Sequence, residues 1–68
     1  MKLSARNQIP GTILEIEPGA VNGVIKVDIG NGNVITSSIT EDAIHELQLA
    51  AGDAVTVVIK ASDVLIGK

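Results

Sequence analysis

Two short stretches near opposite ends of the chain have the residue types of an anion-binding site. The first, Ser4-Ala5-Arg6, contains the chain's arginine, and the second is Lys60-Ala61-Ser62. Each sets a cation and a hydroxyl group around an alanine, whose small side chain lets main-chain N–H groups approach a ligand. The guanidinium group of Arg6 carries five donors in a plane and keeps its charge, which suits an oxyanion. The alternative interpretation is that both cations are ordinary solvated charges near strand ends.

The composition indicates one small domain, residues 1–68, that gains stability by association. A chain of 68 residues buries only about 60% of the surface that its unfolded form exposes. Disulfides are excluded because there is no cysteine, and a single histidine makes a structural metal site a poor alternative. Hydrophobic residues make up 46% of the chain but include no Phe, Tyr or Trp. We therefore expect a homo-oligomer in which aliphatic strands pack across subunits.

The charge and the termini limit the partners. A net charge of −3 opposes general attraction to nucleic acid or to an anionic membrane, so an anion site must be local. No run approaches the roughly 18 apolar residues of a membrane span, and Met1-Lys2-Leu3 lacks the apolar core of a signal peptide. The absence of cysteine agrees with the cytosol. We expect a cytoplasmic protein without a membrane or nucleic-acid partner.

Alternating apolar residues and turn signals predict three strands, a short helix and two further strands. The expected ranges are strands 8–17, 21–29 and 34–39, a helix over 41–47, and strands 54–60 and 64–66. Pro10-Gly11 predicts an edge, a bulge or a bend in the first strand. The Gly30-Asn31-Gly32-Asn33 cluster predicts a tight hairpin. Thr40 is the expected N-cap of the helix, followed by acidic residues that favour its first turn.

This order of elements predicts an all-β fold, a five-stranded OB-like Greek-key barrel with one short helix between strands three and four. The fourth strand is the richest in β-branched residues, so we expect it at the centre of the sheet. In such a barrel the first and last strands lie near one another. The two cationic triplets would then meet at a boundary between subunits.

Three other functions fit the residues less well. Catalysis lacks a nucleophile and base, because there is no cysteine and His45 is alone. Glu41, Asp42 and Glu46 resemble a hard-metal cluster, but an acidic helix start is the better interpretation, so we expect no direct metal ligands. Single-stranded nucleic-acid binding needs stacking aromatics and a positive groove. A structural OB-like oligomer without a ligand, with Glu17 or Asp53 of a neighbour paired to Arg6, stays an alternative.

The joint order of several short motifs resembles the molbindins, small free-standing molybdate-binding proteins built from the Mop or TOBE module. The likeness covers nearly the whole chain. The motifs are Ser4-Ala5-Arg6-Asn7-Gln8 followed by Gly11, Gly19-Ala20-Val21-Asn22, Ile39-Thr40, Leu47-Gln48-Leu49, Gly52, and Lys60-Ala61-Ser62-Asp63-Val64.

The resemblance implies a homohexamer, a trimer of dimers, that holds molybdate or tungstate between subunits and serves storage, buffering or homeostasis without an organic cofactor. The residues that match the family's oxyanion-binding motifs are Ser4, Ala5, Arg6, Thr40, Lys60, Ala61 and Ser62. A second candidate oxyanion site is the turn Gly19, Ala20, Val21 and Asn22, for which a role in packing alone is an equal alternative. Ala43 stands where some relatives have a serine that reaches the anion.

Overall fold

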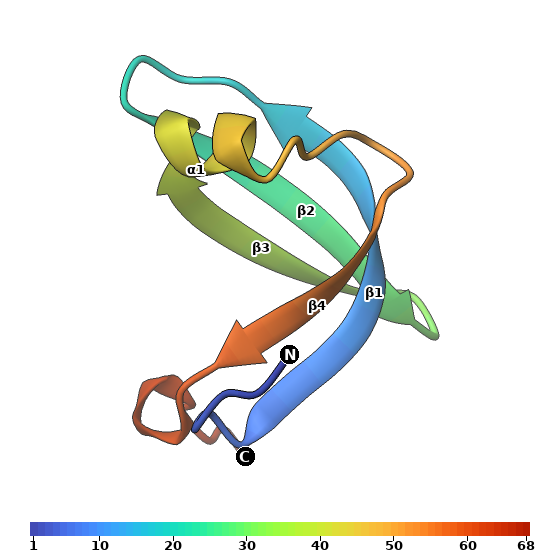
Figure 1. Ribbon diagram of the computed structural model, residues 1–68. Coiled ribbons are helices and arrows are strands. Elements are labelled where there is room, and N and C mark those ends of the chain that lie inside the picture. Colours follow the sequence, from blue (N-terminus) through green and yellow to red (C-terminus); the bar gives the residue numbers. More distant parts are fainter.

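Four antiparallel strands form one strongly curved sheet in the computed structural model, which describes residues 1–68 (Figure 1). The strands are β1 (Asn7–Glu17), β2 (Asn22–Gly30), β3 (Asn33–Thr40) and β4 (Ala54–Ile59), and they lie in the order β3-β2-β1-β4. The helix α1 (Glu41–Glu46) follows β3, and a 3₁₀ turn, η1 (Ala61–Asp63), follows β4. No helix is long and apolar enough to cross a bilayer.

The long strand β1 joins the two halves of the sheet. Its residues 7–12 pair with β4, and its residues 12–17 pair with β2, with a shift of register between Ile13 and Glu15. Pro10 lies in the half that has a partner on one side only, as expected for a proline at an edge. At Gly11 a Cβ atom would lie 2.6 Å from Val27 Cγ1 and 2.7 Å from the Asp28 carbonyl oxygen. Glycine therefore allows β1 to pass close to β2.

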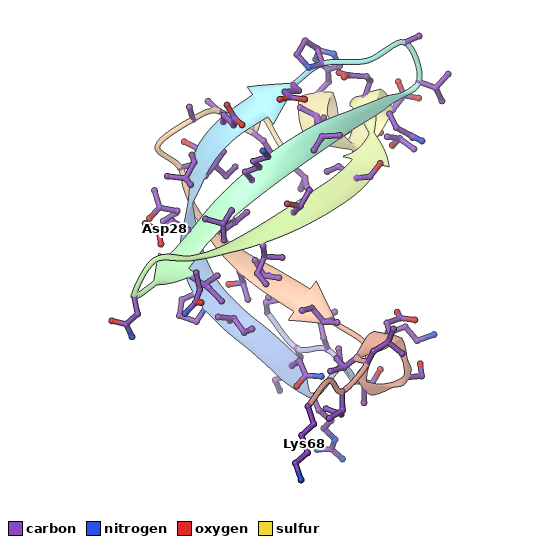
Figure 2. All side chains as sticks on the ribbon, turned by 180° about the vertical axis from the view of Figure 1, so that it is seen from behind. Asp28 and Lys68 are labelled. Carbon is purple, nitrogen blue, oxygen red and sulfur yellow. The ribbon has the colours of Figure 1, made fainter.

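The hairpin between β2 and β3 and the cap of α1 are as predicted. Gly30, Asn31 and Gly32 have φ values of 101°, 55° and 77°, and Asp28 Oδ1 accepts a hydrogen bond from the Gly30 N–H at 2.8 Å (Figure 2). Thr40 has extended backbone angles, and its hydroxyl oxygen accepts from the Ala43 N–H at 3.1 Å. The sequence predicts these two features correctly because a tight turn and a helix cap each depend on about four consecutive residues.

The core is small and lies between the curved sheet and α1. Ile13, Ile25, Val27 and Ile44 are its buried side chains. Val24, Lys26 and Asp28 alternate with the buried residues of β2 and are less buried, which confirms the predicted alternation. Gly23 lies under the helix, where a Cβ atom would meet Ile44 and Glu41. Four buried side chains are few, so much apolar surface stays exposed.

Two predictions about the sheet were wrong. The expected strand 64–66 does not form, so the chain has four strands instead of five, and these make an open sheet and not a closed barrel. The turn η1 leads the chain past the end of β4, and Leu65 and Ile66 are 91% and 90% exposed. The strand β4 is an edge strand and not a central one, because β1 is its sole sheet partner. Its β-branched residues reflect a half-buried face, not a central position.

Candidate anion-binding site

The antiparallel pairing of β1 and β4 brings the two cationic triplets to one end of the molecule. Asn7 pairs in register with Ile59, so the residues just before β1 and just after β4 are neighbours. The Asn7 side chain reinforces this closure, since its Nδ2 donates to the Ile59 carbonyl oxygen at 3.1 Å. Gln8 Nε2 donates to the Ala5 carbonyl oxygen at 2.9 Å, which restrains the first triplet. Both amides belong to the first motif, and the Asn7 amide, whose residue type also suits an anion donor, is used here within the chain.

The two triplets together line one cavity of about 290 Å³. Its lining consists of Ser4, Ala5, Arg6, Lys60, Ala61 and Ser62, and of no other residue. That volume is several times the ~30 Å³ that a water molecule takes in the liquid, so a small oxyanion has room. Six of the seven residues predicted for the main site therefore lie together within a single chain. The sequence had predicted that the two triplets meet at a boundary between subunits.

The cavity has two cations in its lining and no carboxylate. The two ion pairs of the chain join Lys26 to Glu15 at 3.5 Å and His45 to Glu41 at 3.7 Å. Neither Arg6 nor Lys60 takes part in them. Asp63 follows the second triplet in sequence but does not line the cavity. The site therefore offers N–H and O–H donors with two fixed positive charges and no carboxylate.

The seventh predicted residue, Thr40, lies elsewhere. It ends β3 beside α1, whereas η1 lies at the opposite end of the molecule (Figure 1), and Ala61 and Ser62 of η1 line the cavity. Within one chain Thr40 caps the helix and does not line the cavity. Ala43 supplies the N–H that Thr40 accepts, so its position is also part of the cap.

The turn Gly19, Ala20, Val21 and Asn22 is tied to the start of α1. Glu41 Oε1 accepts a hydrogen bond from the Gly19 N–H at 2.8 Å, and the Glu41 N–H donates to the Val21 carbonyl oxygen at 2.8 Å. The Gly19 N–H is thus already engaged by a carboxylate within the chain. Sequence reasoning missed this role of Glu41, although an acidic residue at the first helical position is a recognisable signal.

The acidic residues of α1 do not assemble a metal centre. No group of three or more His, Asp or Glu side chains comes together anywhere in the chain. Glu41 is engaged with Gly19 and, at 3.7 Å, with His45. Glu41 at the helix start therefore has contacts within the chain, to Gly19 and His45, that explain an acidic residue there.

Comparison with known proteins decides the family. The TOBE domain family matches residues 3–66. A probable molybdenum-pterin-binding protein from Haemophilus influenzae is 45% identical over 67 residues, which cover 98% of this chain and 97% of the relative. This chain belongs to the molbindins, the Mop-type TOBE domains. The resemblance expected from the motifs is confirmed.

Solved structures of molbindins have the same fold. A molybdate-binding protein from Sporomusa ovata superposes with a TM-score of 0.93 at 37% identity over the full length of both chains, 100% of each. A structure of the cytoplasmic molybdate-binding protein ModG, with molybdate bound, gives a TM-score of 0.90 at 45% identity. The match covers 96% of this molbindin and 46% of ModG, so this chain spans about half of that protein.

Proposed function

We propose that this molbindin is a cytoplasmic binding protein for molybdate and tungstate, which holds the anions between subunits of a homo-oligomer for storage, buffering or homeostasis. The single observation that carries the proposal is the cavity in which both cationic triplets meet and no carboxylate is present. The names of relatives add support, since three of those compared are described as binding molybdenum-pterin or molybdate, and ModG as cytoplasmic.

The donor set suits a tetrahedral dianion that carries no proton. Arg6 and Lys60 supply charge, Ser4 and Ser62 supply hydroxyl groups, and the alanines allow main-chain N–H groups to approach. Hydrogen phosphate carries a proton that needs an acceptor, and a cavity without a carboxylate satisfies it poorly, so phosphate should bind more weakly. Sulfate has the same charge and shape as molybdate but is smaller. Its rejection depends on the spacing of the donors.

A second subunit supplies what one chain lacks. Five of the six lining residues are exposed in the single chain, Ala5 being the exception, and water weakens hydrogen bonds to a charged ligand. Thr40 ends β3, at the opposite end of the molecule from η1, so it can join the triplets only from a neighbouring subunit. A site between subunits would therefore both exclude water and add a hydroxyl group. The hexamer, a trimer of dimers, is our proposal for that assembly.

Isothermal titration of the purified oligomer with molybdate, tungstate, sulfate and phosphate tests the proposal. We expect saturable heat with molybdate and tungstate, and little or none with phosphate. The matched control is Lys2→Ala, which removes an exposed cation that does not line the cavity and should leave the titration unchanged. An oligomer that gives no heat with any of the four anions would instead be a structural module without a ligand.

A further inference from the structure

The first cationic triplet is held to the rest of the chain by one hydrogen bond. Residues 1–6 precede β1 and belong to no helix or strand. Of the hydrogen bonds within the chain, they take part only in the bond from Gln8 Nε2 to the Ala5 carbonyl oxygen at 2.9 Å. A carbonyl oxygen accepts and does not donate, so the Gln8 amide has to present its NH₂ group there. The orientation of the Ala5 carbonyl group therefore depends on Gln8.

Gln8 can fix this orientation because its own backbone is fixed. It lies in β1 and pairs with Val58 of β4. Ala5 and Arg6 line the anion cavity, whereas Gln8 does not. The Ala5 carbonyl oxygen is therefore drawn toward a strand residue that lies outside the cavity lining.

The same bond sets the direction of the Arg6 N–H group. No peptide bond of the chain is cis, and in a planar trans peptide the carbonyl oxygen and the N–H group point in opposite directions. The Arg6 N–H therefore points away from the Gln8 amide, and it has no acceptor within the chain. A free main-chain donor is thus available at a residue that lines the cavity.

The second triplet has its carbonyl oxygens engaged in a comparable way. The Asp63 N–H donates to the Lys60 carbonyl oxygen at 2.9 Å, and the Val64 N–H donates to the Ala61 carbonyl oxygen at 3.3 Å. Neither Asp63 nor Val64 lines the cavity. The turn η1 supplies these donors from its main chain, whereas the irregular segment before β1 receives its donor from a side chain.

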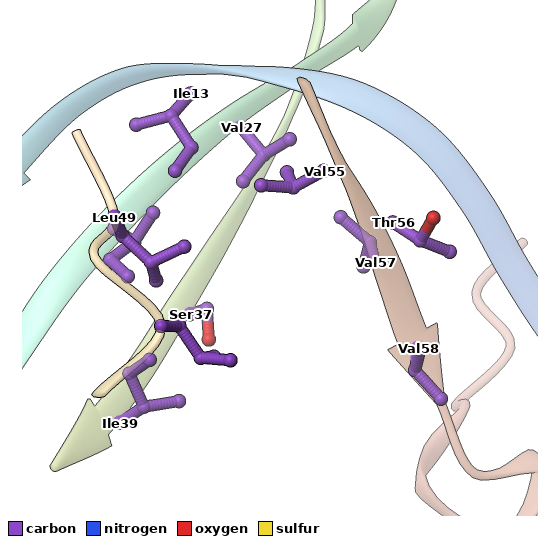
Figure 3. A pocket seen from close by; sticks show the side chains of 11 residues that line it. Ile13, Val27, Ser37, Ile39, Leu49, Val55, Thr56, Val57 and Val58 are labelled. Carbon is purple, nitrogen blue, oxygen red and sulfur yellow. The ribbon is translucent and has the colours of Figure 1, made fainter. Parts of the chain in front are cut away.

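Selection among anions falls to the cavity between the triplets. The other cavity of the chain is an apolar groove of about 220 Å³ between β3 and β4 (Figure 3). Nine of its eleven lining residues are hydrophobic and none is charged. It therefore lacks the donors that an oxyanion needs.

We propose that Gln8 is a positioning residue that sets the anion specificity of this molbindin, by keeping the Ala5 carbonyl oxygen out of the cavity. The inference rests on the proposed function. Hydrogen phosphate brings an O–H group that needs an acceptor, and the Ala5 carbonyl oxygen is an acceptor that Gln8 withholds. Without the Gln8 amide, the Ala5–Arg6 peptide is free to rotate. An unprotonated dianion then loses the Arg6 N–H and meets a lone pair, whereas hydrogen phosphate gains a partner for its proton.

Gln8→Met tests this role, since methionine keeps the length of the side chain and removes its NH₂ donors. Sulfate and hydrogen phosphate are the probes, because both are small tetrahedral dianions that differ by one proton. Each is titrated against the molybdate-loaded oligomer at mildly alkaline pH, and displacement of molybdate gives its Kd. We expect the ratio of the phosphate Kd to the sulfate Kd to fall roughly two- to tenfold in the variant, which is the range of one hydrogen bond.

The matched control is Thr12→Met. Thr12 is exposed, lies on the same face of β1 as Gln8, and makes no side-chain hydrogen bond within the chain. Its replacement should leave both Kd values unchanged. Gln8→Glu exchanges the donors for a carboxylate, so it should lower the ratio at least as far as Gln8→Met. A ratio that keeps its wild-type value overturns the inference, even where all anions bind more weakly, because a merely structural role weakens them in parallel.

Nuclear magnetic resonance of isotope-labelled protein observes the Arg6 N–H directly. Molybdate should shift the Arg6 amide resonance strongly in the wild type and much less in Gln8→Met, and equal shifts overturn the inference. Gln8 is exposed, so the variant should keep its assembled mass in light scattering. Dissociation would assign Gln8 a structural role and overturn the inference too. A wild-type protein that binds no anion overturns the proposed function together with the inference, whereas wild-type binding with an unchanged ratio in Gln8→Met overturns the inference alone.

Discussion

Arg6 shows how much of the site depends on a single side chain. It is one of two cations in the cavity, and neither is neutralised by an ion pair. Each triplet could be recognised in the sequence by its cation, because Arg and Lys are among the few side chains that donate hydrogen bonds and accept none. Their meeting within one chain was not predictable, since it follows from the register that pairs Asn7 with Ile59. Periodicity identifies strands but does not fix which residues stand opposite one another.

Replacement of Arg6 by alanine should weaken molybdate binding while leaving the oligomer largely assembled. A hydrogen bond to a charged group contributes about 1.5–3 kcal/mol, which corresponds to roughly a ten- to hundredfold rise in Kd. Titration calorimetry measures the loss, and light scattering measures the assembly. Arg6→Lys keeps the charge but loses the planar donor pair, so its Kd should fall between the two. Dissociation into single chains that bind as before would contradict the role given to Arg6.

At the level of elements, the residues proposed to bind the anion lie at the ends of strands. Thr40 ends β3 and caps α1, whereas the two triplets precede β1 and follow β4. Local signals predicted the cap and the hairpin correctly, because each depends on a few consecutive residues. The predicted strand 64–66 was wrong because a strand needs a neighbour with a free edge, and the sequence of one chain does not show where that neighbour is.

Thr40→Val should lower the stability of the chain through the helix cap. The change removes the oxygen that accepts the Ala43 N–H at 3.1 Å, and loss of such a cap costs about 1 kcal/mol in the free energy of unfolding. Urea denaturation followed by circular dichroism measures the change. Thr36→Val is the control, because Thr36 is an exposed threonine of β3 whose side chain makes no hydrogen bond within the chain. Equal stability of both variants would show that the cap contributes nothing.

For the whole molecule, the balance between core and surface favours association. Four buried hydrophobic side chains form the core, while ten large hydrophobic residues are exposed, among them Val64, Leu65 and Ile66 after η1. The composition predicted this imbalance, since a short aliphatic chain cannot cover its own apolar surface. Composition could not predict which apolar surfaces pack together between subunits. Their positions depend on the curvature of the sheet and on the direction of the chain after η1.

Native mass spectrometry in molybdate should report anions only on assembled molecules. We expect the proposed hexamer to retain whole numbers of oxyanions, and chains released from it to carry none, because one chain leaves most of its cavity lining exposed. A sample diluted until the assembly dissociates provides separate chains for comparison. Tight retention of molybdate by single chains would show that the cavity is complete without a neighbour.

Both ends of the chain lie at the same pole of the molecule, next to the cavity between the two triplets (Figure 1). Any extension of either terminus therefore starts beside the residues that line the cavity. The same position makes affinity tags hazardous in binding studies. A polyhistidine or polylysine extension at either terminus would add its own cations beside Arg6 and Lys60, so measured affinities need a tag-free protein.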